Sequence, residues 1–129
     1  MNYNDTSRPA VQSAYQMLFY QSSIYDASQL LFRDINGSYC MKETFHQSSL
    51  VYPPVIYDSI LGYEGMRGAF YGCLNLQSIP DFSTCSFGLD SGRMCFTSCD
   101  SLTSVKLNIQ KITDSSGCNF FFYGCSNLN

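Results

Sequence analysis

The sequence has no tryptophan, a single histidine and few charged residues, because Asp, Glu, Lys and Arg together make up only 13% of the chain. Lys and Arg number 7 against 10 Asp and Glu, which gives a formal net charge of −3. Domains that bind nucleic acid carry a clustered excess of basic residues. This composition therefore argues against nucleic acid, or any other polyanion, as the partner.

Long hydrophobic runs are also lacking. No apolar stretch approaches the roughly 18–20 residues that are needed to cross a bilayer, and residues 1–7 contain neither the basic nor the apolar region of a secretory signal. We therefore expect neither membrane insertion nor a cleaved signal in the sequence as given.

What the sequence does contain is an internal repeat. The pattern Phe-x-x-Cys-x-x-Leu occurs three times at a constant interval of 26 residues, with its Phe at positions 70, 96 and 122. Weaker copies begin at Phe45 and Phe19, where Ser48 and Ser22 stand at the Cys position. A period of 20–50 residues is typical of solenoids, propellers and other arrays. The repeat covers nearly the whole chain, so we predict one array and not several independent domains.

We predict a solenoid over residues 15–129, with about four coils and an incomplete fifth. Residues 1–14 lie outside the repeat and either cap the first coil or form an arm that docks on a partner. Each coil should hold a short parallel strand on one side, and a short helical or 3-10 turn with irregular segments on the other. The clearest strand is expected at residues 104–110, where apolar and polar residues alternate, and its counterpart at residues 79–83 contains Pro80.

Stacked coils should bury the repeated apolar positions, because one coil alone cannot cover its apolar face. The residues expected in this core are Phe19, Phe45, Phe70, Cys73, Leu76, Ile79, Phe96, Cys99, Leu102, Val105, Leu107, Ile109, Phe122, Cys125 and Leu128.

Seven cysteines are present, and Cys73, Cys99 and Cys125 occupy one column of the repeat. Free cysteine is among the most buried residue types. Parallel side chains on adjacent coils also hold their Cβ atoms further apart than the roughly 3.8 Å that a disulfide prefers. We therefore predict a ladder of packed thiols, with disulfides as the alternative.

The repeated residues resemble the BspA-like leucine-rich repeats of bacterial surface proteins, which read Phe-x-x-Cys-x-x-Leu-x-x-(Ile or Val). Residues 70–79 and 96–105 match this signature in full, and residues 122–128 match it up to the end of the sequence. The resemblance implies a right-handed leucine-rich-repeat solenoid that serves adhesion or protein interaction without catalysis. It also suggests a bacterial cell surface or, with the open last coil, a virus particle such as a phage as the location.

Catalytic and metal chemistry find little support in the pattern. His46 is the only imidazole that could pair with a thiol, and it sits in a repeat column that otherwise holds Tyr or Thr. A zinc site would have to combine Cys95 and Cys99 with Cys118 and Cys125, whose spacings match no common zinc site. A Ca²⁺ site in an acidic turn is a further alternative, although Asp in such turns usually accepts local backbone hydrogen bonds. We expect no enzyme, no cofactor and no metal.

Surface recognition is the remaining role, and two surfaces are candidates. Tyr20, Tyr71 and Tyr123 share one column, and large amphipathic rings are good contact anchors. The alternative is that these rings only pack over neighbouring coils. The second surface is the wet side of the strands, represented by Asp81, Lys106, Asn108 and Gln110.

The sequence thus favours a non-enzymatic protein-interaction or adhesion module, whose partner is a protein such as a surface receptor. The alternative is a structural subunit of a virus particle or filament. In that case the C-terminal coil, which ends before its expected strand, would dock a neighbour in a homo-oligomer or hetero-oligomer.

Overall fold

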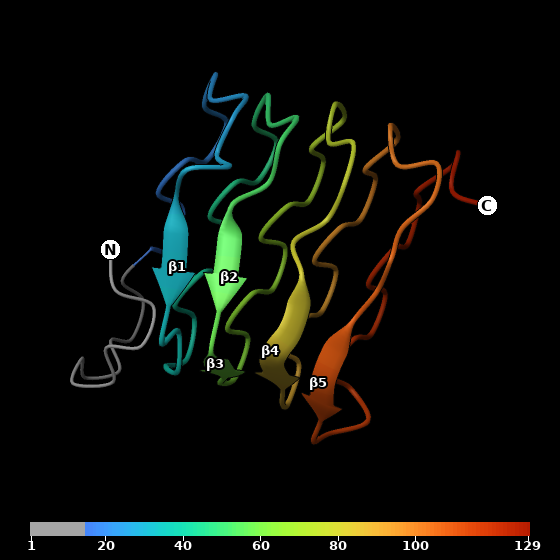
Figure 1. The fold of residues 1–129 in the computed structure, drawn as a ribbon. Helices are drawn as coiled ribbons and strands as arrows, with labels where there is room; N and C mark the ends of the chain where they lie inside the picture. Colours follow the sequence, from blue (N-terminus) through green and yellow to red (C-terminus); the bar gives the residue numbers. More distant parts are fainter. Residues whose placement is uncertain (1–14) are drawn as a thin grey trace.

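The computed structural model describes residues 15–129, so the N-terminal cap or arm predicted at residues 1–14 lies outside the described part. Five short strands follow in chain order: β1 (Leu31–Arg33), β2 (Val55–Tyr57), β3 (Ser59–Leu61), β4 (Phe82–Phe87) and β5 (Ile109–Ile112). All pairings are parallel, with β1 beside β2 in one sheet and β3, β4 and β5 in another. Figure 1 shows the strands in a single row that follows the sequence from β1 to β5.

The repeated Phe residues at positions 19, 45, 70, 96 and 122 each lie in a stretch of turns that we call a Phe segment. The five segments span residues 15–21, 38–47, 63–72, 89–98 and 115–124, so the first precedes β1 and the last follows β5. Adjacent Phe segments are joined by backbone hydrogen bonds. The N–H groups of Phe45 and Gln47 donate to the carbonyls of Ala69 and Tyr71 in the next segment, at 2.8 and 2.7 Å. The N–H of His46, which lies between these two residues, instead donates to the carbonyl of Glu43 in its own segment.

The Phe segments are therefore chains of turns, and the prediction of a helical or 3-10 turn is wrong, since residues 15–129 contain no helix. The cause is a left-handed residue at every fourth position. In the second segment these residues are Tyr39, Glu43 and Gln47, with φ of 61°, 54° and 55°. A left-handed residue cannot propagate a right-handed helix, and alternate N–H groups are thereby directed toward the next segment.

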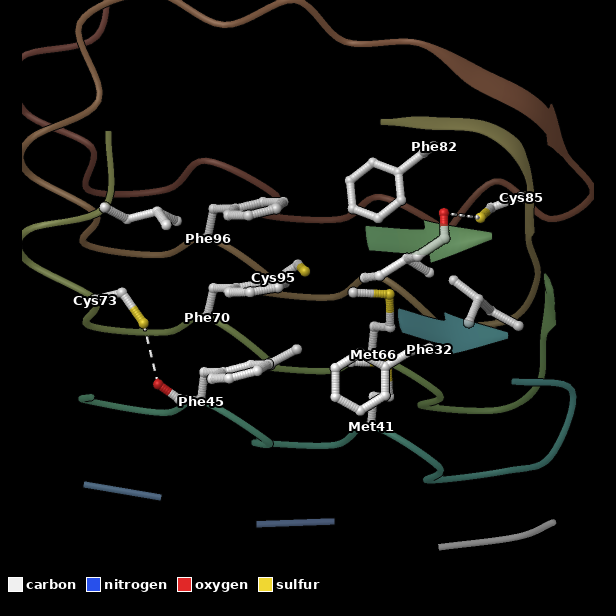
Figure 2. Packing of buried hydrophobic residues seen from close by; sticks show 14 of the residues in the cluster. Phe32, Met41, Phe45, Met66, Phe70, Cys73, Phe82, Cys85, Cys95 and Phe96 are labelled. Atoms are coloured by element: carbon white, nitrogen blue, oxygen red, sulfur yellow. Dashed lines mark hydrogen bonds between the residues drawn. The ribbon is translucent and has the colours of Figure 1, made fainter. Parts of the chain in front are cut away.

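The repeated Phe rings form one continuous stack through the core. Successive ring centroids from Phe19 to Phe122 are 5.1, 5.4, 5.0 and 5.6 Å apart, and neighbouring planes differ by no more than 19°. Phe45, Phe70 and Phe96 are completely buried. Figure 2 shows these three rings aligned one above another, with Met41 and Met66 packed beside them.

The methionine column is interrupted at Gly92, and two rings that the repeat pattern did not single out fill the space. A Cβ atom placed on Gly92 would come within 2.8 Å of Phe121 and 2.9 Å of Phe87. Phe87 is fully buried and Phe121 is 5% exposed, while Phe82 also meets both rings edge to face. The aromatic core is therefore wider at this end of the row than the single predicted column.

Most residues expected in the core lie there. Leu76, Leu102, Cys73 and Cys99 are fully buried. Several others are half-buried and pack against the core: Phe19, Ile79, Val105, Ile109, Phe122, Cys125 and Leu128.

The prediction that Leu107 lies in the core is wrong, because its side chain is 44% exposed. The strand expected at residues 104–110 begins only at Ile109, where it pairs with Phe82 of β4. The fully buried ring of Phe82 packs on Phe96 and Phe121 and so fills the interior beside this part of the chain. The strand expected at residues 79–83 likewise begins later, at Phe82, after Pro80, which has no N–H to donate to a ladder.

The Phe stack yields a stability prediction for Phe96→Ala. Removal of a buried Phe ring leaves a cavity and typically lowers the free energy of unfolding by about 3–5 kcal/mol. The control is Leu74→Ala, at a side chain that is 54% exposed, where a change of no more than about 0.5 kcal/mol is expected. Chemical denaturation followed by circular dichroism measures both, and equal stability of the two variants would contradict the role of the stack.

The left-handed positions yield a second prediction, for Gly68→Ala. Gly68 has φ of 60°, and the nearest atom to an added Cβ would be Glu43 Cγ at 3.5 Å, so the substitution tests the backbone and not the packing. We expect a loss of about 1 kcal/mol. The reciprocal control is Met17→Gly, in the same repeat column with φ of 57° and 45% exposed, which should be at least as stable as the parent in thermal melts. A fully stable Gly68→Ala variant would refute the assignment.

Candidate functional site

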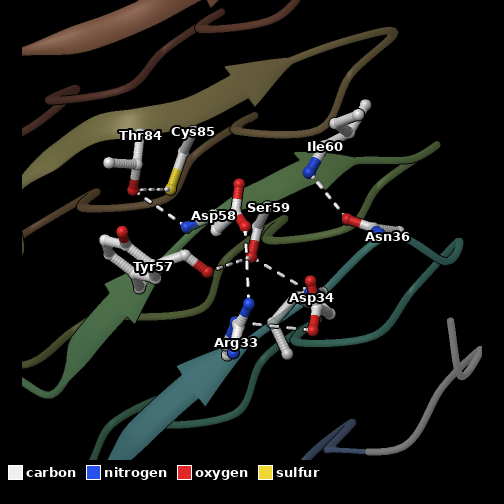
Figure 3. A network of polar contacts seen from close by, with 10 residues as sticks. Arg33, Asp34, Asn36, Tyr57, Asp58, Ser59, Ile60, Thr84 and Cys85 are labelled. Carbon is white, nitrogen blue, oxygen red and sulfur yellow. Dashed lines mark hydrogen bonds and ion pairs between the residues drawn. The ribbon is translucent and has the colours of Figure 1, made fainter. Parts of the chain in front are cut away.

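A polar network connects the bends that follow the first strands, and Figure 3 shows it. The buried Arg33 lies 3.6 Å from the Asp34 carboxylate and 3.8 Å from that of Asp58. The N–H of Asp58 donates to Thr84 Oγ1 at 2.9 Å. The N–H of Ile60 donates to Asn36 Oδ1, in the bend after β1, at 2.8 Å. Asp34 and Asp58 both have positive φ. These side chains serve backbone groups where the strands bend, which is a structural role.

A second charged group lies at the start of the third Phe segment. Glu64 is 6% exposed and accepts hydrogen bonds from Lys42, at 3.1 Å, and from Arg67. Burial alone would raise the pKa of Glu64, but the two cationic donors outweigh burial and hold that pKa below its ordinary value. Glu64 is consequently held ionised and paired, and is not available as a general acid.

The column of cysteines forms a series of thiol donors. The sulfur of Cys73 donates to the Phe45 carbonyl at 3.0 Å, Cys99 donates to Phe70 at 3.1 Å, and Cys125 donates to the carbonyl of Phe96 at 3.0 Å. Each thiol thus ties its own Phe segment to the preceding one. Figure 2 includes the Cys73 contact.

Burial raises the pKa of the Cys73 thiol to about 11 and also raises the pKa values of Cys95, Cys99, Cys118 and Cys125. A thiol is nucleophilic only as the thiolate, so these groups are poor nucleophiles at neutral pH. The four cysteines considered for zinc do not form a metal-binding group, and none is found among residues 15–129.

The predicted tyrosine surface forms in part. The rings of Tyr20 and His46 stack at 4.9 Å and those of His46 and Tyr71 at 4.8 Å, with planes within 16°. Burial lowers the pKa of His46, against an opposing effect of Glu43, so the imidazole is held neutral in the stack near pH 7. Thr97 takes the next place in the column, and Tyr123, 65% exposed, instead meets Phe120 edge to face. The predicted column therefore ends at Tyr71, and its histidine is a full member.

An open groove of about 470 Å³ lies beside the end of this stack. Gly72 is one of the residues that line it and stands in a column with Gln21, Gln47 and Ser98. The side chains of Gln21 and Gln47, which directly follow Tyr20 and His46 in the sequence, are hydrogen-bonded to each other at 2.9 Å. The groove is lined by Gln47, Ser48, Tyr71, Leu74, Asn75 and Ser98, among others. The repeat pattern placed Tyr71 here. Gly72 adds no side chain of its own, and the side chain of Gln47 lies over it, because a Cβ atom placed on Gly72 would come within 3.0 Å of Gln47 Cγ.

A second groove, of about 300 Å³, lies on the strand side between β2 and β4. Pro53, Pro54 and Val55 form one wall, and Ile79 and Pro80 belong to the other. Val55 is 38% exposed and Tyr52, just before it, is 48% exposed.

Of the four residues predicted on the wet side of the strands, only Asp81 lines this strand-side groove. Lys106, Asn108 and Gln110 are exposed on and before β5. Tyr52 and Val55 were not predicted at a surface. Residues 51–57 are all apolar or aromatic, so no alternation in the sequence distinguishes the exposed side chains from the buried ones.

The buried thiols predict a specific order of chemical modification. With iodoacetamide at pH 8, we expect the half-buried Cys118 and Cys125 to react before the fully buried Cys73, Cys95 and Cys99. Peptide mapping by mass spectrometry measures the order. In denaturant without reductant all seven thiols should be labelled, and two fewer labels would establish a disulfide and overturn the ladder.

No family model, curated protein or solved structure matches the chain. The leucine-rich-repeat class and the resemblance to BspA-like repeats therefore stay predictions from the sequence pattern. Within residues 15–129, the structure has no helix with the length and apolar character required to span a membrane.

Proposed function

We propose that the chain is a non-enzymatic protein-interaction module of the leucine-rich-repeat solenoid type, and that it binds its partner through the strand side. The parallel pairing and the Phe stack support the solenoid, because equivalent residues of successive repeats lie next to one another. Such an array presents a broad, rigid surface whose exposed residues can vary without loss of the core.

The observation that carries the proposal is the groove between β2 and β4. The exposed side chain of Val55 lies at its wall, and the prolines on both sides restrict the backbone around it. Tyr52 lies just before Val55 and is 48% exposed. Its N–H donates to the carbonyl of Tyr25 on the neighbouring repeat, and Tyr25 is 62% exposed. Aromatic and aliphatic groups at a preformed hollow are typical of the anchor positions of protein interfaces.

The charges at this groove indicate the character of the partner. Asp81 lines the groove and is exposed. The Asp58 side chain, 54% exposed, follows directly after β2. Asp58 already lies 3.8 Å from Arg33, so Asp81 is the carboxylate that the groove offers. A partner segment that places an apolar side chain in the groove and a Lys or Arg at Asp81 would complement both features.

The groups with catalytic potential have structural partners, which favours a binding role over an enzymatic one. The thiols of Cys73, Cys99 and Cys125 donate to backbone carbonyls. Glu64 is held by two cations, and His46 is stacked between two tyrosines.

The test is selection of a random peptide library on the immobilised chain, followed by affinity measurement with synthetic copies of the enriched peptides. We expect an apolar residue beside a Lys or Arg in these peptides, and a loss of affinity of about tenfold or more for Val55→Asp, which places a charge in the anchor position. Asp81→Asn should weaken binding at low salt and have less effect at high salt, where the charge is screened.

The matched control is Ile112→Asp, at an isoleucine that is 51% exposed on β5. This variant introduces the same charge away from the groove and should bind as the parent does. Peptides that bind both aspartate variants equally, or the absence of any enrichment, would contradict the proposal.

A further inference from the structure

The two side-chain ladders on the Phe segments both end at the same place. The aromatic ladder runs from Tyr20 through His46 to Tyr71 and stops, because the next residue in its column is Thr97. Thr97 is 3% exposed and its hydroxyl donates to the carbonyl of Phe120 at 3.2 Å, so it lies low in the surface. The ring face of Tyr71 that is turned away from His46 therefore has no aromatic successor in the column.

The amide ladder ends beside it. Gln21 donates its Nε2 to Gln47 Oε1, which leaves the Nε2 group of Gln47 as the outer donor of the ladder. The next position in the column is Gly72, which has no side chain to accept from it. Gln47 and Gly72 both line the groove of about 470 Å³, whose volume lies within the range of about 300–1,000 Å³ that is usual for small-molecule sites.

The lining of the groove defines the chemistry of an occupant. Gln47, Asn75 and the hydroxyl of Ser98 can all both donate and accept hydrogen bonds, as sugar hydroxyls do. Tyr71 and the exposed Leu74 supply apolar surface. All the lining residues are uncharged, so the groove selects for a neutral ligand with one apolar face and several hydroxyl groups.

We propose that this groove is a binding site for a neutral pyranose, with the C–H face of the sugar on the Tyr71 ring and a hydroxyl group on the Gln47 amide. The sugar lies in the groove beside the last ring of the aromatic ladder and the last amide of the amide ladder. This site lies on the Phe segments and does not use the strand-side groove, so it stands independently of the protein partner proposed above.

The repeat itself supplies the variants that test the site. Thr97→Tyr extends the aromatic ladder, and Gly72→Gln extends the amide ladder with a residue that already stands at positive φ in this column at Gln21 and Gln47. Gly72→Gln adds a side chain at a residue that lines the groove, and Gln47 must shift to admit it, because the added Cβ would lie 3.0 Å from Gln47 Cγ. Thr97→Tyr adds a ring directly before Ser98, another residue that lines the groove. The matched control for the first is Thr97→Ser, which leaves the groove open.

The probes are the methyl pyranosides of glucose, galactose, mannose and N-acetylglucosamine together with their linear trimers. Titration is followed by ¹H–¹⁵N correlation spectra of the full chain, with the amide of Gly72 as reporter. We expect saturable shifts at Gly72 and Tyr71 with at least one sugar, about tenfold weaker binding in Tyr71→Ala, and loss of binding in both ladder-extending variants. Thr97→Ser should bind as the parent does.

Three results would overturn the proposal. These are an unshifted Gly72 amide with every sugar, retained binding in the two ladder-extending variants, or saturation by phenol without any response to a pyranoside. Since Val55→Asp leaves this groove intact, it should bind sugar normally, which separates a failure of this site from a failure of the strand-side groove. If Thr97→Tyr does not fold, Gly72→Gln and Tyr71→Ala still decide the outcome.

Discussion

The rest of the structure depends on how the Phe segments divide their backbone hydrogen bonds. One N–H group donates to the next segment and the following one donates back within its own, as Phe45 and His46 illustrate. This alternation fixes the register between segments residue by residue. Because the register is fixed, Phe lies on Phe, each repeated thiol reaches the carbonyl of the preceding Phe, and Tyr stacks on His. A shift of one residue would disrupt all of these columns together.

The same arrangement requires left-handed backbone conformations, which L-amino acids adopt with difficulty. Within the described residues, left-handed positions recur at every fourth residue of the Phe segments, and ten of them are occupied by residues other than Gly. Each such residue is disfavoured by roughly 1–2 kcal/mol, whereas burial of one Phe ring contributes about 1.5–3 kcal/mol. Stacking, burial and the ladder between segments act on every repeat, so the array tolerates this local strain. An isolated segment would have none of these compensations, which is why the turns depend on their neighbours.

The features that could be predicted from the sequence are those that depend on equal spacing along the chain. Equal spacing identifies equivalent positions, and from it the Phe stack, the cysteine column and the place of Tyr71 could be predicted. The spacing carries no information on the backbone between those positions, so a helical turn was expected where left-handed residues form successive turns. Local alternation around Leu107 suggested a buried strand, but Phe82, more than twenty residues earlier, fills that part of the interior. The roles of Phe87 and Phe121 at Gly92 likewise depend on neighbours in space.

The candidate binding surfaces follow from departures from the repeat and not from the repeat itself. In a ladder with a fixed register, a smaller residue interrupts a side-chain column, because the segments on either side are held in place by their own hydrogen bonds. Gly72 interrupts the amide column and Thr97 interrupts the aromatic column. The last members of these columns, Gln47 and Tyr71, line the groove. Pro80 has a comparable effect on the strand side, since it cannot donate to a ladder and the open groove lies beside it. The regular columns thus determine stability, and the exceptions to them determine where a ligand can enter.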